Sequence, residues 1–278
     1  MTTAPPPASP RAPSLLRWRA AAGDLLLGSS CHGCGAPAWT LCETCREDLA
    51  ASAVRPARPD PCPPGFPSTW TAGSYDALAR GLVSAHKERS ALGLTRVLGE
   101  RLALAVLALL AEPGGGDQVG EPVLLVPVPS ARRAVRERGF DAGLALARAA
   151  ARRLPDARAA PLLTSTRRVA DQSGLDAAGR QANLAGAFRL RSGSPWSRSR
   201  AGPTAIGTFL GTTVVVVDDV VTSGASLTEA VRALRAGGVT VCGAATAAAT
   251  VRRTPPRGAV GRVSKSLRPA QPEHRGGV

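Results

Sequence analysis

The run from Thr213 to Ser226 constrains the fold more than any other part of the chain. Four consecutive valines, residues 214–217, lead directly into Asp218 and Asp219. A β-branched run of this kind predicts a strand that is buried on both faces. Two adjacent carboxylates at its C-terminal end would repel each other unless a ligand supplied donors or a cation. Ribose hydroxyls together with hydrated Mg²⁺ supply both.

A phosphate-binding loop is predicted directly after the acid pair. The residues are Thr222, Ser223, Gly224, Ala225 and Ser226, and they open an expected helix at residues 224–236. Glycine permits a tight turn, and the hydroxyls and free amides at a helix start can bind a phosphate dianion with help from the helix dipole. An ordinary buried strand with an Asp-rich turn is the alternative. We favour a ribose 5-phosphate site.

The surrounding pattern alternates between strands and helices, which predicts an α/β fold with a parallel sheet and ligands at the C-terminal ends of its strands. Residues 164–187 are polar and contain several glycines, and we interpret them as a loop. We expect strands at residues 123–127, 161–163, 188–191, 213–217 and 239–249, and helices at residues 75–88, 94–110, 141–153 and 224–236.

Four of the six cysteines form two closely spaced pairs, Cys31 with Cys34 and Cys42 with Cys45. Two such pairs can complete a tetrahedral four-thiolate zinc site, and closed sites of this type are usually structural. Two disulfides are the alternative, which a cytoplasmic location disfavours. We expect a cytoplasmic protein without membrane insertion, because the longest apolar run, residues 102–111, is too short to span about 30 Å of bilayer.

The run at residues 214–226 resembles the PRPP-binding signature of the type I phosphoribosyltransferases (PRPP is phosphoribosyl pyrophosphate). Together with the cysteine pairs, it resembles the ComF family of competence-linked, phosphoribosyltransferase-like proteins. Further matching pieces lie between them, although Asp141 stands where that family usually has Asn. These pieces are residues 126–130, Arg138-Gly139-Phe140, Arg167, Gln172, Leu175, Arg180, Asn183 and residues 186–188.

The resemblance implies a type I phosphoribosyltransferase-like sheet flanked by helices, with zinc in the cysteine module and Mg²⁺ bound together with PRPP. It implies catalytic roles for Asp218 and Asp219. The turn after the first strand would face the pyrophosphate, and its arginines either neutralise this leaving group or are simply solvated. The implied PRPP-binding residues are Val217, Thr222, Ser223, Gly224, Ala225, Ser226, Pro129, Ser130, Arg132, Arg136 and Arg180.

Lys87 is one of only two lysines in the chain. It is interpreted either as a cation at the C-terminal end of a helix or as a contact to substrate or phosphate.

The predicted organisation has five parts. They are a disordered segment with a short helix (1–27), a zinc-ribbon-like module (28–54), a Pro-rich linker (55–70), the phosphoribosyltransferase-like domain (71–250, with a flexible insertion at 192–207) and a basic disordered tail (251–278). The net charge of +15 is concentrated at the ends: residues 251–278 carry +6 and residues 1–22 carry +3. Basic tails can hold a polyanion such as nucleic acid, or can simply be solvated.

Three functions are therefore open. The first is an enzyme that transfers phosphoribose from PRPP to an unidentified acceptor. The second is a non-catalytic scaffold or sensor that handles single-stranded DNA with competence proteins, although aromatic residues make up only 3% of the chain and stacking platforms are scarce. The third is a structural zinc protein with an inactive ribose site, against which the intact acid pair argues. The oligomeric state cannot be predicted.

Overall fold

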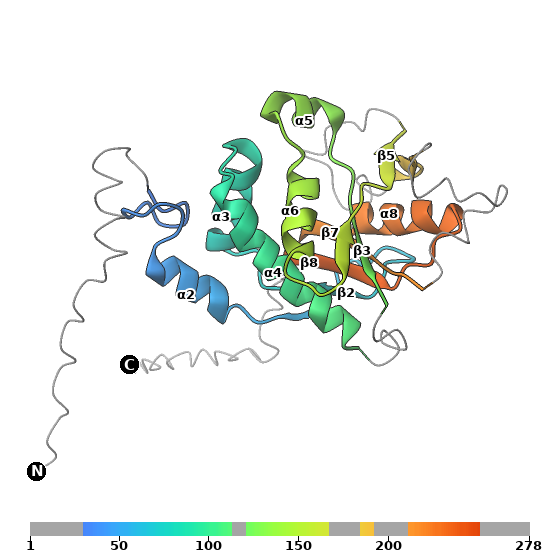
Figure 1. Cartoon of the computed structure of the whole chain (residues 1–278), viewed down its shortest axis with the longest axis horizontal. Coiled ribbons are helices and arrows are strands. Elements are labelled where there is room, and N and C mark those ends of the chain that lie inside the picture. The colour runs from blue at the N-terminus through green and yellow to red at the C-terminus, as the bar shows by residue number, and fades with distance from the viewer. Residues whose placement is uncertain (1–29, 113–120, 167–183, 192–210, 251–278) are drawn as a thin grey trace, which may run out of the picture.

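The computed structural model describes residues 30–112, 121–166, 184–191 and 211–250 (Figure 1). A six-stranded sheet in the order β1-β2-β8-β7-β3-β4 forms its centre, and a two-stranded β5-β6 hairpin lies apart from it. All neighbouring strands of the large sheet are parallel except β1 and β2. The strands are β1 Arg55–Pro56, β2 Thr69–Thr71, β3 Val123–Pro127, β4 Ala157–Ala159, β5 Leu163–Ser165, β6 Phe188–Leu190, β7 Thr213–Val221 and β8 Gly243–Ala249.

The predicted central strand is β7, which pairs with β3 on one side and β8 on the other. The four valines 214–217 are 0–1% exposed, as expected for a strand covered on both faces. The strand is longer than predicted, because it continues through Asp218 and Asp219 to Val221. Pairing with β8 holds this extension, since Asp218 lies opposite Thr246 and Val221 lies opposite Ala249. The acid pair is therefore part of the sheet instead of following it.

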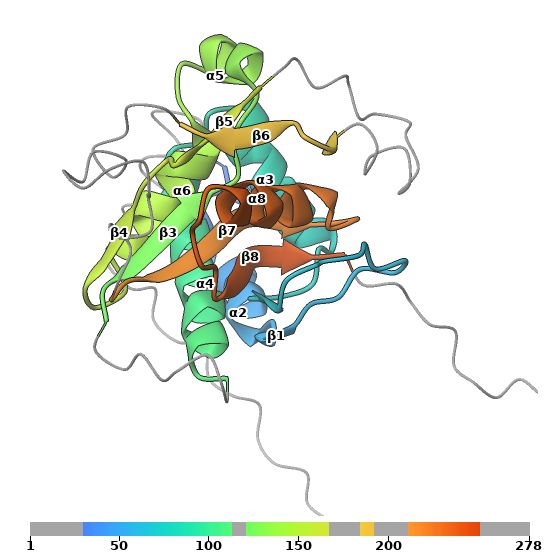
Figure 2. The same ribbon diagram turned by 90° about the vertical axis from the view of Figure 1, so that its right-hand side faces the viewer.

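Helices cover the two faces of the sheet, as Figure 2 shows with α8 on one side and α4 and α6 on the other. Val215 and Val217 belong to the core that contains α4 and α6, whereas Val214 and Val216 belong to the core that contains α8. This alternation is the two-residue period of a strand. The helices are α2 Glu43–Ala51, α3 Ala77–Glu88, α4 Gly93–Leu110, α5 Arg132–Arg138, α6 Ala142–Ala151 and α8 Ala225–Ala236.

The segment interpreted as a Pro-rich linker, residues 55–70, contributes to the folded domain. It contains β1 and the first two residues of β2, and β2 pairs with β8. Ala57 N–H donates to Thr69 O over 2.8 Å, and Ala244 N–H donates to Ser68 O over 2.8 Å. The prolines lack the N–H that a longer strand would need. The chain between β1 and β2 is therefore irregular, and it packs on the face of the sheet that α8 covers.

Several short elements differ from the prediction, among them α5 and β5. The arginine-rich stretch after β3 forms α5, which the sequence pattern did not indicate because none of its residues is buried. The strand expected at residues 161–163 begins at Leu163 and pairs antiparallel with β6. The hairpin of β5 and β6 lies above α8 in Figure 2. Of the predicted loop at residues 164–187, residues 167–183 fall outside the described residues, whereas Thr164 and Ser165 belong to β5. Residues 192–207, the predicted insertion, and both tails also fall outside the described residues.

None of the described helices is long and apolar enough to cross a membrane.

Candidate functional site

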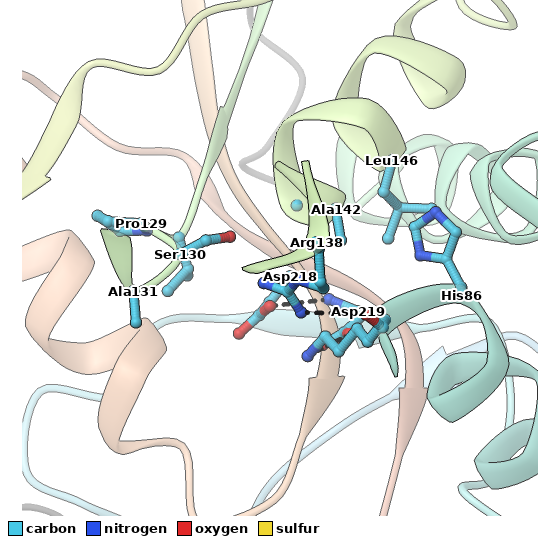
Figure 3. Close-up of a pocket in the computed structure, with 12 residues that line it drawn as sticks. His86, Pro129, Ser130, Ala131, Arg138, Ala142, Leu146, Asp218 and Asp219 are labelled. Carbon is cyan, nitrogen blue, oxygen red and sulfur yellow. Dashed lines mark hydrogen bonds and ion pairs between the residues drawn. The ribbon is translucent and has the colours of Figure 1, made fainter. Parts of the chain in front are cut away.

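The acid pair lies in a cleft at the C-terminal end of the parallel strands, where the β3 turn, α6 and the end of α3 meet. Asp218 and Asp219 come from β7, and Figure 3 shows them beside Arg138, with His86 and Ser130 on opposite sides. The cleft has a volume of about 210 Å³. Its lining residues are His86, Lys87, Val128, Pro129, Ser130, Ala131, Arg138, Ala142, Gly143, Leu146, Asp218 and Asp219.

The two carboxylates differ in their surroundings. Asp219 is buried and forms an ion pair with Lys87, with Nζ 2.5 Å from Oδ2. The Asp218 carboxylate instead accepts the backbone N–H of Asp219 over 2.9 Å. Burial in the cleft, followed by repulsion from Asp219, raises the pKa of Asp218 to about 8. Burial alone would lower the pKa of Lys87, but the charges of Asp219 and Asp218 outweigh it and raise that pKa. Lys87 is therefore a cation at neutral pH.

The turn after β3 is held by a short hydrogen-bond chain. Ser130 Oγ donates to Asp141 Oδ1 over 2.8 Å, and the same oxygen accepts the Leu144 N–H over 3.1 Å. Asp141 thereby caps the N-terminus of α6, a position that aspartate favours as strongly as asparagine. Asp141 therefore fills this N-cap position as well as an asparagine would.

A second cleft of about 400 Å³ adjoins the first on the other side of Pro129 and Ser130. Arg132 and Arg136 of α5 line it, together with Arg191, which directly follows β6. Its floor contains apolar groups such as Val135 and Leu163. Three guanidinium groups around one concavity favour an anion with several oxygen atoms, because each guanidinium can donate two parallel hydrogen bonds to such a group.

The predicted phosphate loop connects β7 to α8. Gly224 has a φ of 76°, a left-handed conformation that favours glycine, and it stands at the N-cap of α8. A Cβ atom at Gly224 would also lie 2.7 Å from the ring of Phe66 and 2.9 Å from Pro59. The proline-rich segment therefore packs directly against the phosphate loop. The hydroxyl-bearing residues Thr222 and Ser226 are exposed and half-buried, respectively, so both can be reached from solvent.

The predicted site residues are distributed over three adjoining places. Asp218 and Asp219 share the first cleft, Arg132 and Arg136 line the second, and Pro129 and Ser130 line both. The loop residues 222–226 are at the start of α8 and line neither cleft, while Val217 is buried within β7. Arg180 lies outside the described residues.

The clefts also contain residues that the sequence reasoning did not assign to the site. His86 and Arg191 had no sequence signal for it, because only the packing of α3 and of the hairpin brings them there. Arg138 was part of the recognised Arg-Gly-Phe segment, and Lys87 stood out as a rare lysine. Burial lowers the pKa of His86, and its Nε2 lies 2.9 Å from Thr95 Oγ1.

The four paired cysteines come together as predicted. One sulfur from each of Cys31, Cys34, Cys42 and Cys45 lies within 4.8 Å of all the others, and all six cysteines of the chain are free thiols. The Cys34 and Cys42 sulfurs are 3.6 Å apart, close to the roughly 3.8 Å edge of a tetrahedron with Zn–S bonds of about 2.3 Å. The cluster fits a four-thiolate metal site, and the alternative of two disulfides is not adopted.

Residues 141–268 match the family model of the phosphoribosyl transferase domain. The matched part contains β7, the acid pair, the phosphate loop and α8, which are the elements that carry the predicted ribose-phosphate site. The chain therefore contains a phosphoribosyl transferase domain, preceded by a four-cysteine cluster. No curated protein matches the chain.

Proposed function

We propose that the protein binds PRPP with Mg²⁺ and transfers phosphoribose to an acceptor, which by family resemblance is a nucleobase-like or other nitrogen nucleophile. The observation that carries this proposal is the position of the acid pair and the phosphate loop on one continuous strand–loop–helix unit, with a cationic cleft beside it. Asp218 and Asp219 would bind the ribose hydroxyls or a hydrated cation. The loop at residues 222–226 would bind the 5-phosphate.

In the proposed reaction, the acceptor nitrogen attacks C1 of the ribose, and the bond from C1 to the pyrophosphate oxygen breaks with its electron pair on that oxygen. The acceptor's proton passes to water. Arg132, Arg136 and Arg191 of the second cleft would stabilise the charge of the departing pyrophosphate, which is the largest electrostatic requirement of the step. Bound Mg²⁺ would supply further positive charge at the pyrophosphate.

Calorimetric titration of PRPP and Mg²⁺ into the wild type and into Asp218→Asn/Asp219→Asn tests the proposal. We expect binding by the wild type and its loss in the double variant, since both acceptor carboxylates are removed. Asp48→Asn, which changes an exposed acid on α2, should bind like the wild type. A folded wild type that fails to bind PRPP would contradict the proposal and favour the function of a non-catalytic scaffold.

We further propose that the cysteine cluster holds structural zinc and that the protein acts in the cytoplasm, where thiols stay reduced. The donor set supports this, because four thiolates at these separations suit the tetrahedral coordination of zinc. Metal analysis of the purified protein should find about one zinc per chain.

The second candidate is a ComF-type role in DNA uptake, with or without catalysis. The cysteine cluster ahead of the phosphoribosyl transferase domain favours it, as does the positive charge of residues 251–278. Single-stranded DNA should then bind with an affinity that falls steeply with salt and that is lost when residues 251–278 are removed. Binding that is indifferent to this truncation would contradict the assignment of the tail.

A further inference from the structure

The ammonium group of Lys87 lies where the ligand of the proposed ribose site would contact Asp219. Its ammonium group lies 2.5 Å from Oδ2 of Asp219, whose side chain is 7% exposed, while the lysine side chain itself is 40% exposed. One carboxylate of the acid pair is thus neutralised by a side chain of the protein itself. Lys87 belongs to α3, outside residues 141–268, the part that matches the family model.

Neighbouring groups fix the end of α3 that carries this lysine. Arg138 Nη1 donates to the backbone O of Lys87 over 3.5 Å, and the adjacent His86 ring packs edge-on against Phe140, with ring centroids 5.6 Å apart. Arg138 is the last residue of α5 and lines the first cleft, and Phe140 lies between α5 and α6. The backbone of Lys87 is therefore held against the cleft, whereas its long side chain can still change partner.

The chemistry of the pair favours such a change. The ammonium group of Lys87 occupies an oxygen of Asp219 that ribose hydroxyls or a hydrated cation would also use, so these ligands compete with Lys87 for the carboxylate. The ammonium group has three donors and no acceptor, and the phosphate oxygens of the ligand offer it anionic partners in place of Asp219.

We propose that Lys87 is a substrate-binding residue that exchanges Asp219 for a phosphate or pyrophosphate oxygen when the phosphorylated ribose enters the cleft. In the free protein Lys87 is the counter-ion of Asp219. In the complex Asp219 faces the ribose or the hydrated cation, and Lys87 contacts the anion. This inference rests on the proposed function, because it assumes that a phosphorylated ribose is the ligand.

The wild-type protein tests the exchange directly, because Lys87 and Lys265 are its only lysines. Brief acylation with an amine-specific reagent, followed by peptide mass spectrometry, measures the reactivity of Lys87 with Lys265 as internal reference. Mg²⁺ alone should accelerate the acylation of Lys87, because an ammonium group without its carboxylate partner loses its proton more readily. Mg²⁺ with PRPP should slow the reaction below the rate in the free protein. A rate that neither addition changes would overturn the proposal.

The variant Lys87→Gln provides a second measurement. We expect it to weaken the binding of PRPP with Mg²⁺ by about tenfold to a hundredfold, the usual effect of losing a hydrogen bond between charged groups. It should bind Mg²⁺ alone more tightly, since Asp219 is freed. Arg96→Gln is the matched control, because it removes a cation from an exposed ion pair with Glu100 on α4. A merely structural lysine would lower the thermal midpoint without raising the affinity for Mg²⁺, and that result would contradict the exchange.

The two proposals fail in different ways. If the wild type binds PRPP while neither measurement on Lys87 responds, the exchange is wrong and the proposed function stands. If the wild type does not bind PRPP, the proposed function fails, and acylation with Mg²⁺ and inorganic pyrophosphate still tests whether Lys87 leaves Asp219. If Lys87→Gln does not fold, the acylation of the wild type decides the question alone.

Discussion

At the scale of single residues, Asp218 shows how a functional site works against stability. Burial and the neighbouring Asp219 raise its pKa in the folded protein to about 8 from an ordinary value of 3.8. Between these two values the folded state binds more protons than the unfolded state, so this group lowers the stability as the pH rises from about 4 to about 8.

Asp218→Asn should therefore be more stable than the wild type, by a margin that grows between pH 5 and pH 8. Thermal unfolding of both proteins at pH 5, 6.5 and 8 measures this margin. The exposed control Asp48→Asn should follow the wild type at every pH. A margin for Asp218→Asn that is the same at all three values would show that Asp218 titrates normally.

Gly224 is a second residue whose environment leads to a prediction. Alanine at this position must adopt a left-handed backbone and also meet Phe66 and Pro59. Gly211 has a φ of 70° and no atom within 4 Å of an added Cβ. The variant Gly211→Ala therefore measures only the cost of the left-handed backbone, which is about 1 kcal/mol. We expect Gly224→Ala to lose more unfolding free energy than Gly211→Ala, by roughly 1–3 kcal/mol for the overpacked contact. Equal losses, measured in urea, would mean that Phe66 moves away freely.

At the scale of elements, one buried side chain joins α8 to the β5-β6 hairpin. Glu229 accepts the Phe188 N–H over 3.1 Å and pairs with Arg232, whose Nη2 donates to Phe188 O over 3.2 Å. Burial alone would raise the pKa of Glu229, but its hydrogen bonds from Arg232 and Phe188 outweigh it and lower that pKa. The helix that begins at the phosphate loop thus holds the strand that precedes Arg191 in the second cleft.

Glu229→Ala should remove this connection. It leaves the Phe188 N–H without its acceptor, which costs about 1–3 kcal/mol when the group stays buried. Hydrogen exchange at Phe188 should become faster by about tenfold or more. Glu137→Ala, which breaks an exposed pair with Arg133 on α5, should change stability by less than about 0.5 kcal/mol. Unchanged exchange at Phe188 would show that β5 alone holds β6.

At the scale of the whole molecule, the cysteine cluster and the sheet domain share one core. Cys31 and Cys45 belong to the same buried cluster as Leu82 of α3 and Leu102 of α4. The buried Arg101 of α4 donates to the C-cap residue of α2, Ser52, over 2.6 Å and also to Ala72 O, which follows β2. In Figure 1, α2 lies beside α3. The residues interpreted as a separate zinc module are therefore packed onto the helix that carries Lys87.

Removal of the metal should for this reason destabilise the whole domain. We expect a chelator, or Cys45→Ser, to lower a single thermal midpoint by roughly 10 °C or more, because a structural metal contributes folding free energy directly. Cys62→Ser should keep the metal and the midpoint, since Cys62 is not part of the cluster. Two separate unfolding transitions, with the second one unaffected by the chelator, would show that the two parts fold independently.

Local patterns in the sequence were sufficient for the features that depend on neighbouring residues alone. The valine run, the acid pair, the glycine-containing loop and the two cysteine pairs each extend over no more than about fifteen positions, so β7, α8 and the sulfur cluster could be predicted. The apolar face of α8, which includes Leu227 and Leu234, is buried as its helical period indicated. The length of β7 could not be predicted in this way, because pairing with β8 extends it through two charged residues.

Tertiary structure alone decided which distant residues reach the site. Two features follow from the sequence, because spacing along the chain determines both. They are the family to which the central motif belongs and the four-thiolate cluster. The pairing of Lys87 with Asp219, the position of Arg191 and the packing of Phe66 on Gly224 do not follow from it, because each joins residues more than a hundred positions apart or depends on how the hairpin packs. These contacts depend on which side chains are buried and on how the elements pack against one another. No local run of residues determines either.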